Sequence, residues 1–188
     1  MEKKEVVGFY RPDTGKKTTS ELRKNANIPA VLYGKNLLVH VYVPIRLIQD
    51  IIYTPNVCYI DLNVEGDHYD CIIQDIQFHP VSDVITHIDF LHIVPGKKIK
   101  MNIPIEIVGN AIGVKKGGKL VQKLKKLPIS AKIEDMPDKI TVDVSNLDSN
   151  NFIRVVNIEQ KNFKVNYVPG TPIVSVEASR AARIAESQ

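Results

Sequence analysis

The sequence has few of the features that mark secreted, metal-binding or membrane proteins. It contains two cysteines and no Cys-x-x-Cys pair, which is a poor basis for a zinc site. No uninterrupted apolar run approaches the roughly 20 residues that span a bilayer. The opening residues, Met-Glu-Lys-Lys-Glu, lead into no apolar signal segment. We therefore expect a cytoplasmic protein without a membrane segment, a metal or a cofactor.

The two cysteines lie on extended segments that flank the turn "EGD" of a predicted hairpin. A hairpin centred near Gly66 places Cys58 opposite about Gln74 and Cys71 opposite about Asp61. This offset forbids a disulfide within the hairpin. We expect both cysteines to be buried thiols in a reducing compartment.

The rest of the composition is that of a folded soluble protein. The chain has 188 residues, of which 44% are hydrophobic, enough for one large domain or two small ones. Its first half contains several short runs of strand character, in part alternating apolar and polar residues. These runs are "KEVVGFYR", "AVLYG", "LLVHVYV", "CYIDLNV", "HYDCIIQDI" and "VITHIDFLHI". They predict a small β-barrel with two short helices.

The two helices are expected between the strands. In "TGKKTTSELRKNANIP", Thr18 and Glu21 have the spacing of a capping box, and Asn27 with the following Ile-Pro predicts the helix end. Pro44 opens the second helix, which stops at Thr54-Pro55. Its apolar face consists of Ile45, Ile48, Ile51 and Ile52.

The segment "VPGKK" interrupts the strand pattern, and we place a domain boundary there, between residues 1–94 and 95–188. The second part opens with "IKMNIPIEIVG" and continues in short strands at "ITVDVS", "FIRVVNI" and "TPIVSVE". It is predicted to be a second mainly β domain, with a short helix after Gly118. The Ala-rich tail from Ala178 to Gln188 is expected to be a short helix or a frayed end.

Charge is distributed unevenly along the chain. Residues 1–35 carry 8 basic and 4 acidic side chains, residues 36–94 carry 1 and 8, and residues 97–126 carry 9 and 1. Two basic segments therefore flank an acidic, strand-rich middle. Segregated positive charge favours binding to a polyanion such as a nucleic acid, although a charge run is also typical of a solvated face.

The segment "GVKKGGKL" is close to the phosphate-binding loop G-x-x-x-x-G-K-[ST]. Gly113, Gly118 and Lys119 are in register, but Leu120 stands where that loop needs a hydroxyl to reach Mg²⁺. The surroundings also lack the alternating strands and helices of a nucleotide-binding domain. A lysine-rich β-turn is the simpler interpretation, and nucleotide binding through Gly113–Lys119 remains the alternative.

The stretch "THIDFLHI" carries His87 and Asp89 in an otherwise apolar strand. Residues i and i+2 of a strand point to the same face about 6.5 to 7 Å apart, so Ile88 and Phe90 point to the core. Three interpretations follow: a small enzyme or metal site using the His87/Asp89 pair, a structural histidine beside an exposed carboxylate, or a polar face that contacts RNA.

The RNA interpretation gives each kind of side chain a separate task. Cations would supply affinity for phosphates. These cations are Arg11, Lys16, Lys17, Arg23, Lys24 and Lys35. Asp89 would supply specificity, because a carboxylate accepts hydrogen bonds from a base amino group or a 2′-hydroxyl. Tyr33 adds an aromatic ring and a hydroxyl beside Gly34-Lys35.

The motifs "LRKNANIPAVLYGK", "IIQDIQFHPV" and "THIDFLHI", in this order and spacing, resemble those of a known family. It is the family of bacterial large-subunit ribosomal proteins that bind 5S ribosomal RNA, in the longer two-domain form of the general stress protein Ctc. The second half, with "IPIEIVGNAIGVKKGGKL" and "MPDKITVDVSNLDSNNFIRV", is similar to the C-terminal domain of that form.

This resemblance implies a non-enzymatic protein of the large ribosomal subunit, located on the ribosome. Its N-terminal domain is expected to be a six-stranded β-barrel bound to the loop E region of 5S rRNA in the central protuberance. Other large-subunit proteins and 23S rRNA are the further expected partners. The RNA-binding positions that the resemblance implies are Arg11, Lys16, Arg23, Tyr33, Gln74, His87 and Asp89.

The sequence also departs from the family pattern. Ser20 and Glu21 stand where an arginine is usual before Leu-Arg, and Asn27 replaces the usual glycine before Ile-Pro, a position where Asn still allows a positive φ. The stretch from Gly118 to Lys126 is unusually rich in lysine. A second RNA contact is therefore expected at Lys115, Lys116, Lys119 and Lys123.

Overall fold

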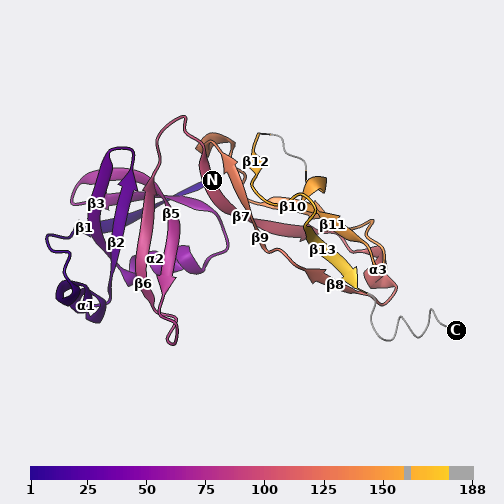
Figure 1. Cartoon of the computed structure of the whole chain (residues 1–188), viewed down its shortest axis with the longest axis horizontal. Coiled ribbons are helices and arrows are strands. Elements are labelled where there is room, and N and C mark those ends of the chain that lie inside the picture. Colours follow the sequence, from indigo (N-terminus) through magenta and orange to yellow (C-terminus); the bar gives the residue numbers. More distant parts are fainter. Residues whose placement is uncertain (159–161, 178–188) are drawn as a thin grey trace. The chain divides into compact units, whose positions relative to one another are not determined.

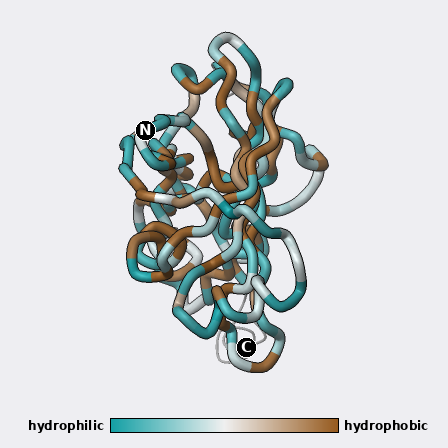
Figure 2. Tube along the Cα trace, turned by 90° about the vertical axis from the view of Figure 1, so that its left-hand side faces the viewer, coloured by the Kyte–Doolittle hydropathy of each residue, from teal (hydrophilic) through white to brown (hydrophobic). Residues whose placement is uncertain are grey.

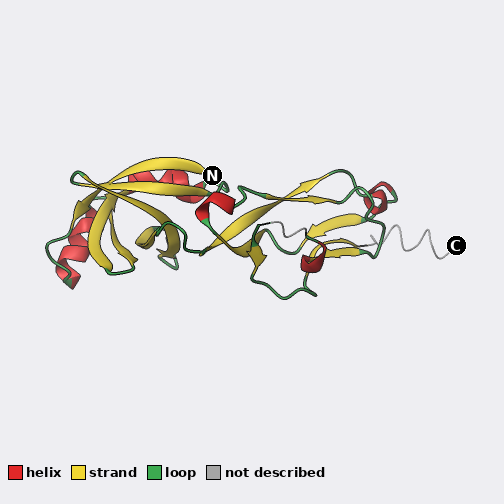
Figure 3. Cartoon of the chain, turned by 90° about the horizontal axis from the view of Figure 1, so that it is seen from above, coloured by secondary structure: helices red, strands yellow, loops and turns green. Residues whose placement is uncertain are grey.

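A computed structural model describes residues 1–158 and 162–177 (Figure 1). The chain divides into two compact units, Met1–Lys97 and Lys98–Gln188. Strands dominate both units, with only short helices between them (Figure 3). The Ala-rich tail expected at residues 178–188 lies outside the described residues.

The first unit is a closed six-stranded barrel, which confirms the expected fold. Its strands are β1 (Glu2–Tyr10), β2 (Asn27–Gly34), β3 (Leu37–Pro44), β4 (Cys58–Val64), β5 (Asp67–Phe78) and β6 (Ile85–His92). They are hydrogen-bonded in the order β1-β3-β2-β6-β5-β4. The barrel closes where β1 pairs in parallel with β4, from Glu2 opposite Cys58 to Gly8 opposite Val64.

The barrel core follows from the period of two along each strand. Inward residues such as Leu32, Leu62, Ile88 and Phe90 are completely buried, while their neighbours along the strands are more exposed. Figure 2 shows hydrophobic and hydrophilic residues interspersed along the chain. Alternation therefore separates the chain into an apolar interior and an outward face that is free to carry function.

Two helices connect the strands of the barrel. Helix α2 (Ile45–Tyr53) starts directly after Pro44 and buries Ile48 and Ile51, as its apolar periodicity predicts. Helix α1 (Lys16–Lys24) also forms, but its N-cap is Gly15 and no side chain caps it, so the capping box predicted at Thr18 and Glu21 is wrong.

The end of α1 also differs from the sequence expectation. The backbone turns at Ala26, with φ of 56°, whereas Asn27 is the first residue of β2. The positive φ that glycine or asparagine would favour is therefore one residue earlier than the family pattern suggested, and it lies at an alanine.

Both cysteines are free thiols. Cys71 pairs with Ile60 across the β4–β5 hairpin, one residue away from the position expected from the sequence. Cys71 is completely buried, and burial raises the pKa of its thiol well above the usual range. Burial also raises the pKa of the partly exposed Cys58, so both side chains favour the neutral thiol.

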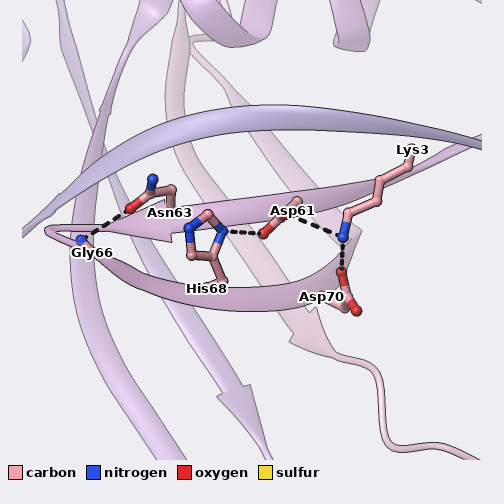
Figure 4. Close-up of polar contacts among 6 residues, drawn as sticks. All are labelled: Lys3, Asp61, Asn63, Gly66, His68 and Asp70. Carbon is pink, nitrogen blue, oxygen red and sulfur yellow. Dashed lines mark hydrogen bonds and ion pairs between the residues drawn. The ribbon is translucent and has the colours of Figure 1, made fainter.

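An ion cluster lies where β1, β4 and β5 meet on the outside of the barrel (Figure 4). The Lys3 ammonium lies 3.0 Å from a carboxylate oxygen of Asp61 and 3.0 Å from one of Asp70. His68 Nδ1 lies 3.0 Å from the other oxygen of Asp61. Desolvation raises the pKa of Asp61, but Lys3 and His68 outweigh it and lower that pKa overall.

The second unit is also mainly β, as predicted. Its strands are β7 (Ile99–Val108), β8 (Lys119–Gln122), β9 (Lys126–Ala131), β10 (Ile140–Asp143), β11 (Phe152–Arg154), β12 (Lys164–Val165) and β13 (Pro172–Glu177). One sheet has the order β10-β7-β9-β12 and the other the order β11-β13-β8. Its short helices are α3 (Ile112–Lys115), η1 (Ile133–Asp135) and η2 (Val155–Asn157).

The short helix expected after Gly118 is wrong. Residues 119–122 form strand β8, which pairs with β13, with Leu120 opposite Val176 and Gln122 opposite Val174. This pairing gives residues 119–122 backbone hydrogen bonds to a neighbouring strand. A helix of about two turns is only marginally stable on its own, so the strand is favoured.

The alternation along β6 predicts opposite effects of two neighbouring substitutions. Ile88→Ala should lower the free energy of unfolding of the barrel by about 2–5 kcal/mol, because it leaves a cavity in a packed core. His87→Ala should change it by about 0.5 kcal/mol or less. Urea unfolding followed by tyrosine fluorescence reports mainly on the barrel, since six of the seven tyrosines lie in residues 1–97. Equal losses for the two variants would contradict the assigned faces.

The ion cluster predicts a stability effect that depends on pH. Because the folded-state pKa of Asp61 is depressed, its contribution is present above the unfolded-state pKa of about 3.9 and is lost as the pH falls further. Lys3→Met should therefore destabilise the barrel at pH 7, and the gap to wild type should shrink in acid. A gap that is constant from pH 7 to pH 2 in urea titrations would show that the ion pairs do not cause it.

Candidate nucleic-acid interface

The outward side of β6 carries the pair that the sequence singled out. Ile88 and Phe90 are completely buried, and the side chains of His87 and Asp89 remain 23% and 32% exposed on the other face. The structure therefore leaves both polar groups at the barrel surface, where neither belongs to the apolar core.

His87 and Asp89 contact one another along the strand. Nδ1 of His87 lies 2.8 Å from Oδ1 of Asp89, and within the described residues this buried Nδ1 makes no hydrogen bond of good geometry. The imidazole and the carboxylate therefore lie side by side in close polar contact on the outward face of β6.

Strand β2 brings Tyr33 to the same region. It runs parallel to β6, with Val31 opposite Asp89 and Tyr33 opposite Leu91. Desolvation, followed by the negative charges of Asp89 and Asp75, raises the pKa of Tyr33. The phenol therefore keeps its proton, and it can donate a hydrogen bond close to two carboxylates.

On the other side of β6, an irregularity in β5 places two further polar side chains. The register shifts between Ile73, opposite Phe90, and Asp75, opposite Asp89. Gln74 lies within this bulge and is exposed. Bulges commonly re-aim a side chain at a functional surface, and here the bulge brings Asp75 across from Asp89.

These pairings form a continuous line across four strands, β3, β2, β6 and β5, which we call the outward row. It runs from Arg11, whose backbone NH donates to the His40 carbonyl, through His40 opposite Val31 to Asp89 and Asp75. Sequence reasoning missed His40 and Asp75 as members of this surface. The alternation in "LLVHVYV" could have identified His40, but the bulge that positions Asp75 has no clear sequence signal.

The two arginines predicted to bind RNA, Arg11 and Arg23, also make contacts within the protein. Nη2 of Arg11 donates to Thr19 Oγ1 at 3.3 Å and to the Asp13 carbonyl at 3.4 Å. Arg23 donates from Nε and Nη2 to the Thr86 carbonyl, at 3.1 and 2.9 Å. These bonds anchor α1 against the barrel. Because a guanidinium has five N–H groups, each arginine keeps donors for a further partner.

The lysines around α1 are exposed. Lys16 and Lys17 form its first turn, Lys24 its last, and Lys35 lies in the β2–β3 turn. The first turn contains no acidic residue. Cations at a helix N-terminus oppose the helix dipole, at a cost of about 0.3–1 kcal/mol each, so Lys16 and Lys17 are poorly placed for helix stability.

The phosphate-loop alternative does not fit the second unit. The backbone NH of Gly113 donates to the Leu147 carbonyl, and that of Gly118 donates to the Gly113 carbonyl at 2.8 Å. Lys119 begins a strand, where a phosphate-binding loop would begin a helix. The amides that would hold a phosphate are therefore committed to the fold.

The four lysines expected to form a second contact differ in their surroundings. Lys116 makes a bidentate ion pair with Asp148, at 3.0 and 2.8 Å. Lys123 lies 3.9 Å from Glu177. Lys115 and Lys119 are exposed at the end of α3 and the start of β8. The charge of Lys116 is thus the one most fully compensated.

Within the described part of the chain, no group of three histidine, cysteine or acidic side chains is arranged to hold a metal ion. Among the same residues, no helix is long and apolar enough to cross a membrane.

Comparison with known proteins accounts for both units. Residues 8–90 match the model of the Ribosomal L25p family, and residues 98–180 match that of the C-terminal domain of ribosomal protein TL5. The first unit thus carries one ribosomal-protein domain and the second unit another.

Full-length relatives extend this match over nearly the whole chain. Large ribosomal subunit protein bL25 of Amoebophilus asiaticus is 50% identical over 179 residues, covering 95% of this chain and 91% of the relative. Its counterpart from Cytophaga hutchinsonii is 39% identical over 187 residues, covering 100% and 97%. That of Phocaeicola vulgatus is 37% identical over 190 residues, covering 97% and 96%.

The chain is therefore a ribosomal protein of the large subunit, and it belongs to the bL25 family. This confirms the family expected from the sequence motifs and the predicted location on the ribosome. The protein is a structural component and not an enzyme, so His87 and Asp89 need a role other than catalysis.

Proposed function

We propose that the barrel binds 5S rRNA, at its loop E region in the central protuberance of the large subunit. The observation that carries this proposal is the outward row, which places His40, Asp89 and Asp75 on the outward faces of β3, β6 and β5, without any role in the core. The basic helix α1 lies beside it, anchored by Arg23 to the backbone of β6. A non-canonical RNA helix, with accessible base edges, suits a surface of this kind.

In this proposal, cations hold the phosphate backbone. Arg11, Lys16 and Arg23 make the main contacts, and Lys17, Lys24 and Lys35 add to them. The position of Lys16 and Lys17 at the N-terminal turn supports the assignment, because a bound phosphate would compensate both the lysines and the helix dipole. Such contacts give affinity that depends on salt but carry no sequence information.

Specificity comes from the groups on and beside the outward row. Tyr33 and Gln74 can donate hydrogen bonds to base edges, and Gln74 can also accept them. Asp89 can only accept while ionised, which suits a base amino group or a 2′-hydroxyl. His87 lies against the Asp89 carboxylate and presents its own ring for stacking on a base.

We further propose that residues 1–94 and 95–188 act as two domains with separate contacts. The second domain would reach 23S rRNA or neighbouring large-subunit proteins, using Lys115, Lys119 and Lys123. Lys116 should contribute least, because Asp148 already compensates its charge.

Replacing the specificity carboxylate should weaken only specific binding. For Asp89→Ala we expect the free energy of binding to 5S rRNA to fall by about 1–3 kcal/mol, with no loss in binding to an unrelated duplex RNA of equal length. The reason is that Asp89 repels phosphates and contributes only through the hydrogen bonds that it accepts. Filter binding with both RNAs measures the two affinities.

Asp50→Ala provides a matched control, because Asp50 is an exposed carboxylate on α2. It should leave the affinity for 5S rRNA unchanged. If Asp89→Ala behaved like this control, Asp89 would have no part in recognition.

Replacing phosphate-binding cations should change the salt dependence instead. Lys16→Gln and Lys17→Gln should each reduce the magnitude of the slope of log K against log salt concentration by about 0.7–0.9. The reason is that loss of one phosphate contact means that binding releases one counterion fewer. Binding measured from 50 to 300 mM KCl gives the slope. Arg46→Gln, at an exposed position on α2, should leave it unchanged. An unaltered slope in both lysine variants would remove α1 from the interface.

A further inference from the structure

A pocket of about 250 Å³ lies where the end of α1 meets the turn between β5 and β6. We call it the α1 pocket. Its lining consists of Arg23, Ala26, Asn27, Ile28, Ile45, His79, Ser82, Val84, Ile85 and Thr86. Ile28 and Ile85 are each only 2% exposed, so they form an apolar floor. The pocket is smaller than the roughly 300–1,000 Å³ of sites for drug-sized ligands, and it suits a single planar ring.

One wall of the α1 pocket is the guanidinium of Arg23. Its two hydrogen bonds to the Thr86 carbonyl, at 3.1 and 2.9 Å, fix the plane of the group. Arginine planes are one of the surfaces on which unstacked RNA bases commonly stack. Because the plane is already fixed, a base would bind without ordering this side chain first.

A second wall is the imidazole of His79, which the turn also holds in place. Its Nδ1 lies 3.3 Å from the backbone NH of Ser82 and 3.4 Å from that of Val81, both of which donate to it. The Ser82 hydroxyl lies 3.1 Å from the same atom. A ring nitrogen that accepts in this way leaves the proton on Nε2, where it can donate to a ligand.

Asn27 gives the α1 pocket a group that can discriminate between bases. Its amide can both donate and accept, and no hydrogen bond holds this side chain within residues 1–158 and 162–177. Its side chain thus adds a polar contact point that a glycine would not provide.

We propose that the α1 pocket receives one unstacked base of the RNA bound to the barrel. This inference rests on the proposed function. The charge of the lining supports an RNA occupant, because Arg23 is a cation and the described lining residues include no carboxylate. The position supports it too, since Thr86 in the lining directly precedes His87, and His87 pairs with Gln77 of β5.

Base insertion requires a nucleotide that is free to leave the helix. Unstacking costs the least free energy for a bulged or mismatched nucleotide. The phosphate of that nucleotide would remain close to Arg23 and Lys24. The base would lie between the Arg23 and His79 planes, above Ile28 and Ile85, with its polar edge toward Asn27. The occupant is therefore a nucleotide of a non-canonical RNA region, and not of a regular duplex.

Filling the α1 pocket tests the proposal. Val84 is 51% exposed at its rim, and Val84→Trp should occupy the space with an indole. We expect the affinity for 5S rRNA to fall about 5- to 150-fold, the range expected for loss of one stacked base, without a change in the salt slope. Val7→Trp is the matched control, at a valine that is 40% exposed on β1, and it should bind as wild type does.

A scan of abasic nucleotides through the RNA identifies the inserted base. One abasic position should weaken binding to wild type but cause no further loss in Val84→Trp, because the same contact is already missing. Asn27→Ala and His79→Ala should show the same coupling at that position. They keep the test decisive if circular dichroism shows that Val84→Trp does not fold.

The outcomes separate this inference from the proposed function. If wild type shows no preference for 5S rRNA over unrelated RNA, the proposed function fails. If wild type binds specifically while Val84→Trp binds equally well, or no abasic position is coupled to the pocket variants, only the base pocket is wrong. Unchanged RNA affinity together with lost occupancy of the large subunit would mean that a protein segment fills the pocket, which also overturns the inference.

Discussion

The parallel pairing of β2 with β6 determines which side chains the barrel turns inward. Ala30 pairs with Ile88, and Val31 pairs with Asp89. Because a closed barrel has one inside and one outside, a slip of one residue would place Asp89 in the core and Ile88 at the surface. Burying an unpaired carboxylate costs a large amount of free energy, so the observed register is strongly favoured over the shifted one. The same pairing that secures the core therefore presents His87 and Asp89 outward.

The acidic residues of the barrel fall into two groups with different surroundings. Asp61 and Asp70 share the Lys3 ammonium, so their charge is used to tie β1 to the β4–β5 hairpin. Asp89 and Asp75 face each other across β5 and β6, although like charges in that position are unfavourable. Asp89 contacts the His87 imidazole, and no lysine or arginine of the described residues forms an ion pair with it. This contrast explains why one acidic cluster serves stability while the other is available for recognition.

Much of the barrel could be predicted from strand periodicity, because alternation reflects local geometry. The faces of Ile88, Phe90 and α2 follow from it directly. The bulge at Gln74 and the pairing of β8 with β13 depend on contacts between distant segments, so no local sequence pattern predicts them. The same holds for Arg23, which sequence reasoning treated only as a phosphate ligand, whereas its bonds to Thr86 also give it a structural task.

We propose that one side of the barrel contacts RNA, and the histidines distributed around the barrel can test this. His87 lies beside the outward row and His79 in the α1 pocket, whereas His68 belongs to the ion cluster on β4 and β5. The most direct measurement is ¹⁵N NMR of the imidazoles during titration with 5S rRNA, with assignments from His→Gln variants. We predict that the His87 and His79 signals change while that of His68 stays constant. Changes at His68, with His87 unaffected, would contradict the account.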